Sequence, residues 1–455
     1  MKNLSLSNII AATHGEYHGP TDILDREITA VTTDSRSVTV GGLFAAIPGE
    51  RVDGHDYIGK AADAGALVAL AQRVPETCAQ PVIVVRNTVE ALGDLAAFYR
   101  RQFDVPVLGV TGSVGKTTAK EMLSSVLSQR FRVHKTAKNL NNELGVPLTL
   151  FGLDETTEFA VVEMGISHFG EMTRLAEIVA PDMALYTVIG SAHLEFLGDY
   201  DGVFRAKTEM LPLLPPDGTV FLNGDDPTLR KVRCAQAICR YGTAPDCDVR
   251  AENVRLLGRD GMALDIVSAE RRIPAKINAY GVHMVTAALG AAAVGIKMGL
   301  TDSEIAAGIA AYAPVGSRSG VLQTGSLTII DDCYNANPTS TASALDSLAL
   351  LPGRHVCILG DMKELGENEA QLHYDIGVHA VKTGCSLVVC CGEISQEIAA
   401  GANAALGESA VWFADRPALI AALPKLLQKG DAVLVKASHS MAFAEIVEAL
   451  QGMSF

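Results

Sequence analysis

Apolar runs of strand length alternate with helical patterns through the middle of the chain. The run at 105–110 ends in a glycine-rich turn, and residues 116–130 then repeat apolar positions at helical spacing. The apolar residues that fall on one face of this predicted helix are Ala119, Met122, Leu123, Val126 and Leu127. Further runs with the pattern of buried strands follow at 159–163, 183–189 and 219–222. This alternation predicts a mostly parallel sheet with helices on both faces.

The two ends of the chain repeat the alternation on a smaller scale. Before residue 86, strand-like runs at 43–47 and 82–85 flank an alanine-rich pattern at 57–71 that predicts a helix. Beyond the turn-rich stretch 311–320, a smaller Rossmann-like sheet is indicated by strand-like runs at 327–330, 356–359, 387–391, 411–413 and 432–435. We therefore expect an α/β protein of three domains: a small N-terminal unit over 1–86, a central domain over 87–313 and a C-terminal domain over 314–455.

The composition excludes several classes of protein. Among 455 residues 48% are apolar and 20% are charged, so each domain can bury a core and disorder is excluded. The 52 acidic residues outnumber the 37 basic ones and give a net charge of −15, which argues against a nucleic-acid surface. No apolar run approaches the ~18 residues that span a bilayer, and the N-terminal segment makes a poor signal peptide. Because the nine cysteines lack metal-ligand spacing, we expect a cytoplasmic protein with reduced thiols.

Residues 109–118 read GVTGSVGKTT and lie between a predicted strand and a predicted helix. Glycines let backbone N–H groups converge on phosphate oxygens, and the start of a helix adds its dipole. In the generic loop G-x-x-x-x-G-K-[ST] the lysine reaches the β- and γ-phosphates and the hydroxyl holds Mg²⁺, roles that fall here to Lys116 and Thr117. Val110 replaces the first glycine of that pattern, yet strand, loop and helix are all in register. The sequence predicts a nucleoside triphosphate site.

A triphosphate site also needs groups that hold its metal. Glu163 ends an apolar run at the edge of the sheet where the phosphate loop lies, and it fits a metal ligand or a strand-end charge equally well. His193 follows another predicted strand, although a lone histidine is more often a core or surface residue. Lys207, on composition alone, is a solvated helix lysine. The residues by themselves leave these three roles open.

Several further motifs, in this order, resemble the Mur ligase family. After the phosphate loop come Asn139-Leu-Asn-Asn-Glu-Leu-Gly-Val-Pro147, Val162-Glu-Met-Gly165, His193-Leu-Glu195 and Arg205-Ala-Lys207. The branch of the family that adds D-alanyl-D-alanine is resembled most by Asp331-Asp-Cys-Tyr-Asn-Ala-Asn-Pro338 and Gly360-Asp-Met-Lys-Glu-Leu-Gly366. The UDP-binding domain of the family is resembled by Thr33-Asp-Ser-Arg36, Gly42-Leu-Phe44 and Asp53-Gly-His55. The resemblance covers essentially the whole chain.

The resemblance implies roles that the residues alone leave open. The lysine that matches Lys207 is typically carbamylated in the family, which turns a cation into a carboxylate-like metal ligand. Glu163 and His193 match residues that hold metal beside it, and Thr117 matches the ligand of the triphosphate-bound ion. The resemblance therefore implies ATP, two Mg²⁺ ions and an N6-carboxylysine. The implied catalytic set is Lys116, Glu163, His193, Lys207 and Arg318.

The nucleotide and the other substrates also have matching residues. Arg318 resembles an arginine that the C-terminal domain brings to ATP, and Asp332 matches a ribose contact. The residues implied at the nucleotide are Thr111, Gly112, Ser113, Val114, Gly115, Lys116, Thr117, Thr118, Asn142, Arg318, Asp332, Asn335 and Asn337. For the remaining substrates the resemblance implies Ser35 and Arg36 at the uridine end, together with Asn141 and Ser438.

The implied activity is amide-bond formation driven by ATP. A carboxylate attacks the γ-phosphorus to give an acyl phosphate and ADP, and an amine then attacks the acyl carbon while phosphate leaves. The expected substrates are small molecules, namely ATP, UDP-MurNAc-tripeptide and D-alanyl-D-alanine, and the product is the UDP-MurNAc-pentapeptide of peptidoglycan synthesis. We expect a monomer without a nucleic-acid partner or a membrane span.

Two segments depart from the family pattern. The family pattern G-x-H-N-x-x-N is replaced in this chain by Gly281-Val-His-Met-Val-Thr286. We expect Met284 and Thr286 to occupy the two positions at which asparagine amides of the family would contact adenine. Where Lys-Gly-Ser-Arg-Ser is usual, the chain has Ala437 and His439. A histidine does not grip a carboxylate with two parallel hydrogen bonds, as an arginine does.

Three other interpretations stay open. A folylpolyglutamate synthase or another Mur ligase would share the phosphate loop and the carbamylated lysine, although the string at 334–338 and the UDP-type N-terminal region argue against both. A P-loop switch or mechanochemical ATPase would need neither Lys207 beside the metals nor a second Rossmann-like domain. An inactive scaffold is motivated only by the departures, which lie outside the triphosphate core.

Overall fold

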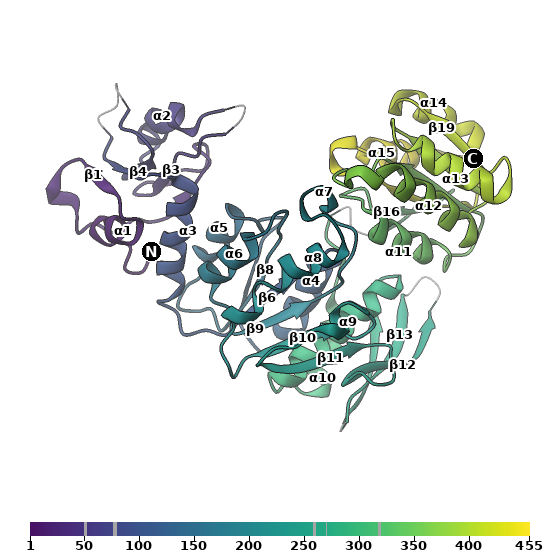
Figure 1. The fold of residues 1–455 in the computed structure, drawn as a ribbon, viewed down its shortest axis with the longest axis horizontal. Helices are drawn as coiled ribbons and strands as arrows, with labels where there is room; N and C mark the ends of the chain where they lie inside the picture. The colour runs from purple at the N-terminus through teal and green to yellow at the C-terminus, as the bar shows by residue number, and fades with distance from the viewer. Residues whose placement is uncertain (50–51, 76–79, 258–260, 270, 317–319) are drawn as a thin grey trace.

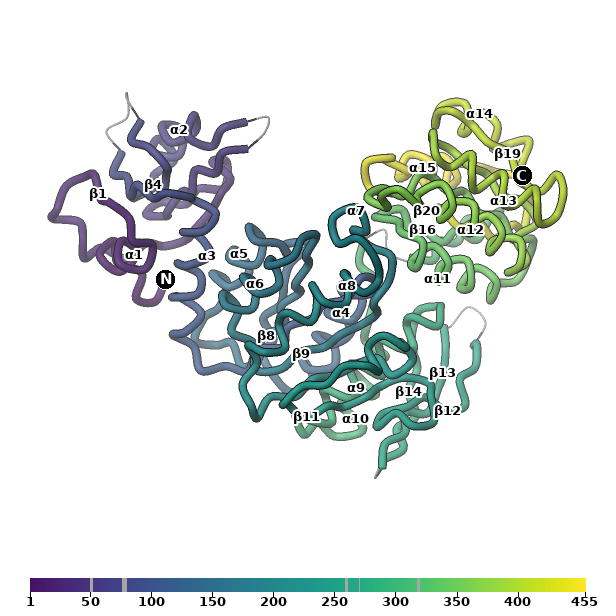
Figure 2. The backbone as a smooth tube through the Cα atoms, in the orientation of Figure 1, coloured from purple at the N-terminus to yellow at the C-terminus, as the bar shows by residue number. Residues whose placement is uncertain are grey.

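The computed structural model describes residues 1–455 except 50–51, 76–79, 258–260, 270 and 317–319. Figure 1 shows three α/β units that follow one another in chain order. Over the described residues their sheets have five, nine and six strands. The same succession can be followed along the backbone in Figure 2. The expected α/β class with three successive units is confirmed, while the domain boundaries stay a prediction.

The N-terminal unit is a small sheet with strand order β1-β5-β4-β3-β2. Its elements are α1 (Leu6–Thr13), β1 (Glu16–His18), β2 (Val31–Thr32), β3 (Leu43–Ala45), α2 (Ile58–Asp63), β4 (Val68–Ala71) and β5 (Val82–Val84). The single helix predicted over 57–71 is wrong in its second half, because α2 ends at Asp63 and β4 follows. Gly65, with φ at +96°, turns the chain away from the helix. All four residues of β4 are buried between β3 and β5, so this apolar run is a parallel strand.

The central unit carries the large sheet in the order β14-β13-β12-β11-β10-β9-β6-β8-β7. The parallel part, which was expected, consists of β6 (Val107–Thr111), β7 (Val133–Lys135), β8 (Phe159–Glu163), β9 (Met183–Tyr186), β10 (Thr219–Asn223) and β11 (Ala237–Gly242). An antiparallel extension, which no sequence pattern singled out, consists of β12 (Val249–Leu256), β13 (Met262–Val267) and β14 (Arg272–Ile277). Exposed and buried residues alternate along β14, as in a sheet with one face in water.

Helices cover both faces of the large sheet and divide its core in two. They are α3 (Thr88–Arg100), α4 (Lys116–Leu127), α5 (Gly145–Leu150), α6 (Glu171–Val179), α7 (Leu194–Leu197), α8 (Tyr200–Thr208), α9 (Val282–Lys297) and α10 (Asp302–Ala311). On one face α4, α9 and α10 pack together, and the five apolar residues predicted on one side of α4 are all buried. On the other face one apolar cluster continues from α1 and the small sheet through α3 to α5 and α6. The first two units therefore share a core.

The C-terminal unit has strand order β15-β16-β20-β17-β18-β19, and only β15 is antiparallel to its neighbour. Its strands are β15 (Gly320–Gln323), β16 (Thr328–Asp331), β17 (His355–Gly360), β18 (Leu387–Cys391), β19 (Ala410–Phe413) and β20 (Ala432–Lys436). Its helices are α11 (Pro338–Leu348), α12 (Glu369–Lys382), α13 (Gln396–Leu406), α14 (Arg416–Leu426) and α15 (Ala444–Gln451). Separate apolar clusters fill the two faces, as a doubly covered Rossmann-like sheet requires. Among the described residues, no helix combines the length and the apolar character that crossing a membrane requires.

Candidate active site

The phosphate loop connects β6 to α4, and its backbone requires glycine. Gly112 has φ at +143°, and a Cβ atom there would lie 2.0 Å from the Thr187 hydroxyl. Gly115, with φ at +83°, directly precedes the first turn of α4. Thr187 follows β9 and fixes the loop by donating to the Val114 carbonyl at 2.6 Å. The N–H groups at the start of α4 are thus presented to a phosphate.

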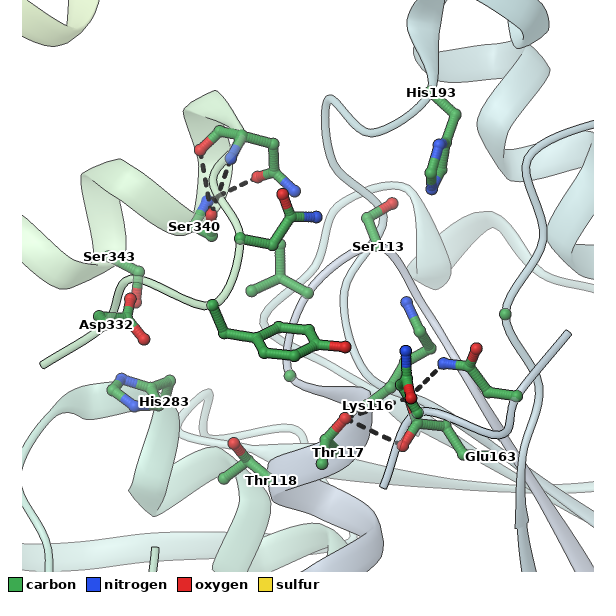
Figure 3. A pocket seen from close by; sticks show the side chains of 18 of the residues that line it. Ser113, Lys116, Thr117, Thr118, Glu163, His193, His283, Asp332, Ser340 and Ser343 are labelled. Carbon is green, nitrogen blue, oxygen red and sulfur yellow. Dashed lines mark hydrogen bonds between the residues drawn. The ribbon is translucent and has the colours of Figure 1, made fainter. Parts of the chain in front are cut away.

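Lys116 and Thr117 begin α4 and lie beside Glu163, the last residue of β8 (Figure 3). Lys116 Nζ donates to the Gly112 carbonyl at 2.7 Å, so the side chain folds back over the loop. The Thr117 hydroxyl donates to the Glu163 carboxylate, 2.9 and 3.1 Å from its two oxygens, and the Asn141 amide donates to it at 2.7 Å. Because β6 and β8 are neighbouring parallel strands, the carboxylate reaches the phosphate loop, as the sequence predicts.

A cavity of about 400 Å³ lies between the phosphate loop and the C-terminal unit. Of the residues predicted at the site, those that line it are Ser113, Val114, Gly115, Lys116, Thr117, Thr118, Asn141, Asn142, Glu163, His193, Asp332, Asn335 and Asn337. Predicted residues that are described but do not line it are Thr111, Gly112, Lys207, Ser35, Arg36 and Ser438. Arg318 lies outside the described residues. Two units therefore enclose one polar cavity of a size suited to a nucleotide.

The cavity wall also contains residues that were not predicted, and two of them, Lys436 and His283, carry ionisable side chains beside Asp332. Lys436 Nζ donates to Asp332 Oδ2 at 2.5 Å and to the Asn335 carbonyl at 2.8 Å, which fixes the predicted ribose contact. The ring nitrogens of His283 are buried and hydrogen-bond to no described residue, and burial lowers its pKa. Figure 3 shows His283 beside Asp332, so a neutral imidazole borders the predicted nucleotide position. The motif at 436–440 contained a signal for Lys436, but only Ser438 and the departures at Ala437 and His439 were singled out.

The departure at the start of α9 changes the chemistry of this wall. Counted from Gly281, the two asparagines of the family pattern fall on Met284 and Ala287, so the assignment of the second position to Thr286 is wrong. Met284 and Ala287 are both buried in the core between α9 and the sheet. Neither position offers an amide to the cavity.

His193 comes from the loop after β9 and contacts the C-terminal unit. Its Nδ1 lies 2.5 Å from Oε2 of Glu364, which follows β17, and the backbone N–H of Glu195 donates to the Glu364 carbonyl at 3.2 Å. Burial lowers the pKa of His193 and outweighs the opposing effect of the Glu364 carboxylate. A contact between two units therefore involves a predicted metal ligand.

Lys207 lies on α8 and is not the solvated lysine that composition alone suggested, because only 1% of its surface is exposed. Burial lowers the pKa of its amine well below the ordinary value, and the nearby Lys116 ammonium adds to the shift. Within the described ranges, no three His, Cys, Asp or Glu side chains gather as a metal site. A metal here would rely on the Thr117 hydroxyl, Glu163, phosphate oxygens and water.

Of the residues predicted for the other substrates, Asn141 lines the cavity, whereas Ser35, Arg36 and Ser438 do not. Ser35 and Arg36 follow β2 in the N-terminal unit, where Arg36 forms an exposed ion pair with Asp34 at 2.7 Å. Ser438 follows β20, and its hydroxyl accepts the Lys363 N–H at 3.0 Å. A substrate that touches these residues and the phosphate loop has to extend across more than one unit.

His373 gives the C-terminal unit a pH-dependent stability. It is fully buried on α12, its Nε2 accepts the Met362 N–H at 2.9 Å, and its Nδ1 lies 2.7 Å from the Glu369 carbonyl. Because burial lowers its pKa in the folded protein, protonation favours the unfolded chain. We expect the melting temperature to fall as the pH drops below 6.5, the ordinary histidine value, and to fall less in His373→Gln. Thermal melts between about pH 5 and 8 test this, and identical pH profiles would exclude it.

Three domain-family models match the chain in succession. They are the Mur ligase family, catalytic domain at residues 27–100, the Mur ligase middle domain at 110–295, and the Mur ligase, glutamate ligase domain at 317–439. The chain belongs to the Mur ligase family.

Curated relatives and solved structures are similar to the chain over nearly its whole length. UDP-N-acetylmuramoyl-tripeptide--D-alanyl-D-alanine ligase of Escherichia coli is 36% identical over 99% of each chain, and the Bacillus subtilis protein of that name is 36% identical over 93% of each. A crystal structure of MurF from Acinetobacter baumannii has a TM-score of 0.91 at 30% identity, covering 99% of both chains. MurF ligase from Thermotoga maritima, in complex with ADP, has a TM-score of 0.83 at 27% identity, covering 93% of this chain and 97% of that one.

Proposed function

We propose that this protein is an ATP-dependent ligase that joins D-alanyl-D-alanine to UDP-N-acetylmuramoyl-tripeptide in the cytoplasmic stage of peptidoglycan synthesis. The likeness to ligases of that name over nearly the whole of both chains carries the proposal. The cavity supports it, because it joins a phosphate loop to a second unit that can cover the nucleotide. When the second unit covers the nucleotide, it keeps water from a reactive acyl phosphate.

The charges around the cavity suit attack of a carboxylate on ATP. The loop N–H groups and Lys116 would hold the β- and γ-phosphates and stabilise charge on the transferring phosphoryl group. Asp332, fixed by Lys436, would accept hydrogen bonds from the ribose. The tripeptide carboxylate attacks the γ-phosphorus and ADP leaves. The amine of the dipeptide then attacks the acyl carbon and loses a proton as phosphate leaves.

The donors in the site fit magnesium. A hydroxyl and a carboxylate, from Thr117 and Glu163, lie together beneath the loop, and His193 faces the same cavity. Bound Mg²⁺ would neutralise charge on the phosphoryl group. Lys207 supplies a buried amine whose pKa lies well below its ordinary value, mainly because of burial, and a neutral amine adds CO₂ with loss of a proton to give a carbamate that would serve as a further ligand. The roles of Arg318 and Asn142 at ATP stay predictions. So do the roles of Ser35 and Arg36 at uridine, those of Asn141 and Ser438 at the other substrates, and the monomeric state.

Phosphate release from ATP tests the proposed reaction. UDP-MurNAc-tripeptide and D-alanyl-D-alanine are added separately and together, and the products are identified by mass spectrometry. We expect release only with both substrates, in a one-to-one ratio with the pentapeptide. Release that does not depend on the dipeptide would contradict the proposal and favour a nucleotide switch.

A further inference from the structure

Beneath the phosphate loop lies a buried lysine that the proposed reaction does not use. Lys120 is on α4, one turn after Lys116, and none of its side chain is exposed. Its Nζ donates to the Thr136 carbonyl at 2.8 Å and lies 3.0 Å from Glu121 Oε1 and 3.7 Å from Glu163 Oε2. A fully desolvated cation therefore contacts the carboxylate that the proposed function assigns to the metal.

Thr136 links the lysine to Glu163 in a second way. Its hydroxyl accepts the Glu163 N–H at 2.9 Å while its carbonyl accepts from Lys120, and its side chain is fully buried. On the opposite side, Glu121 also pairs with Lys135, which is partly exposed on β7. Charges thus alternate from Lys135 through Glu121 and Lys120 to Glu163, and the four sum to zero.

The cost of burying charge explains what Lys120 does for Glu163. Burying a carboxylate away from water costs free energy unless a nearby cation offsets its charge. Glu163 is such a carboxylate, because only 1% of its surface is exposed. Thr117 and Asn141 donate neutral hydrogen bonds to it, and Lys120 adds positive charge at ion-pair distance. A divalent cation on the open side of the carboxylate would offset the same charge, and Lys120 would repel it.

We propose that Lys120 is a positioning residue that serves as the built-in counter-ion of Glu163: it stabilises the carboxylate while the metal is absent and weakens the binding of Mg²⁺, so that metal and ADP can leave after each turnover. The inference rests on the proposed function in one respect, the assignment of Mg²⁺ to Glu163. The contact between Lys120 and Glu163 itself does not depend on that assignment.

The first part of the test uses thermal melts of the metal-free protein in EDTA. The proteins are the wild type, Lys120→Met, Glu163→Gln and the double variant. We expect Lys120→Met to lower the melting temperature by on the order of 5 °C, because it leaves a buried anion without its cation. In the Glu163→Gln background the same substitution should cost clearly less, since no charge is left unpaired. If Lys120→Met does not fold, Lys120→Gln replaces it, because an amide can still donate to Thr136 and carries no charge.

The second part titrates MgCl₂ at a fixed ADP concentration and follows the rise in melting temperature. The quantity compared is the MgCl₂ concentration that gives half of the full rise. We expect Lys120→Met to need about tenfold less Mg²⁺ than the wild type, because a repelling charge is gone. Lys135→Met is the matched control, since it removes a cation from the same Glu121 without a contact to Glu163, and its Mg²⁺ requirement should be unchanged.

A lysine with a purely structural role would give a different result. In that case Lys120→Met would lower the melting temperature by the same amount with and without Mg²⁺, or the variant would need more Mg²⁺ than the wild type. Either outcome overturns the inference. A wild type that Mg²⁺ and ADP do not stabilise would contradict the proposed function instead. The EDTA comparison of the four proteins then still decides whether Lys120 is the counter-ion of Glu163.

Discussion

Replacing Lys116 with methionine will reduce ligase activity by about 10³-fold or more while the protein keeps its fold. The half-buried Lys116 folds over the phosphate loop onto the Gly112 carbonyl, and it supplies positive charge where the β- and γ-phosphates are expected. Methionine has a similar length and no charge, so the packing is retained and the stabilisation of the phosphoryl group is lost. The measurement is kcat at saturating ATP, with circular dichroism to confirm the fold.

The matched control for this variant is Lys382→Met. Lys382 is an exposed lysine in the last turn of α12, far from the phosphate loop in the chain, and its loss should leave kcat unchanged. If Lys116→Met retained more than about a tenth of the activity, the assignment of 109–118 to ATP would be wrong, because a charge at the γ-phosphate is worth far more than tenfold.

Lys207→Met will lose activity to a similar degree, about 10³-fold, and will also lose a spectroscopic signal. Lys207 is buried on α8, and burial lowers the pKa of its amine well below the ordinary value, which favours the neutral amine that adds CO₂. With ¹³C-bicarbonate, the NMR spectrum of the wild type should contain a carbamate resonance that the variant lacks.

The melting temperature separates this loss from unfolding. Methionine fills a similar volume without a polar group to desolvate, so the metal-free variant should melt at or above the wild-type temperature. A wild-type spectrum without a carbamate resonance would overturn the N6-carboxylysine, whereas a low melting temperature of Lys207→Met would point to a structural role for its amine.

The sequence was most informative where a function depends on neighbouring residues or on strand ends. The phosphate loop is a local strand–loop–helix, and parallel neighbours bring Glu163 to it without further information. The interval 57–71 was misjudged because alanine is compatible with a helix and with a buried strand. Pairing with β3 and β5, which lie on either side of Val68–Ala71 in the sheet, makes this run a strand, and the periodicity of the interval itself does not contain that information.

Burial of charged residues was the property that the sequence could not supply. Lys207 and Lys120 are helix lysines with ordinary neighbours, and nothing in their spacing indicates that both are almost completely buried. His283 reaches the cavity from the central unit, so its proximity to Asp332 depends on how two units pack, whereas Lys436 and Asp332 lie at the ends of the neighbouring strands β20 and β16. Such contacts are set by tertiary structure rather than by periodicity.

The core that continues through α3 has a bearing on the order in which the chain can fold during synthesis. Leu4 and Ile9 share one apolar cluster with Leu175 of the central unit, and the cluster extends to Val232. Domains generally fold as units as they leave the ribosome. Here the first unit cannot complete its core while only its own residues have emerged, since its apolar partners are still being translated. The C-terminal unit, with clusters of its own, can fold afterwards as a separate step.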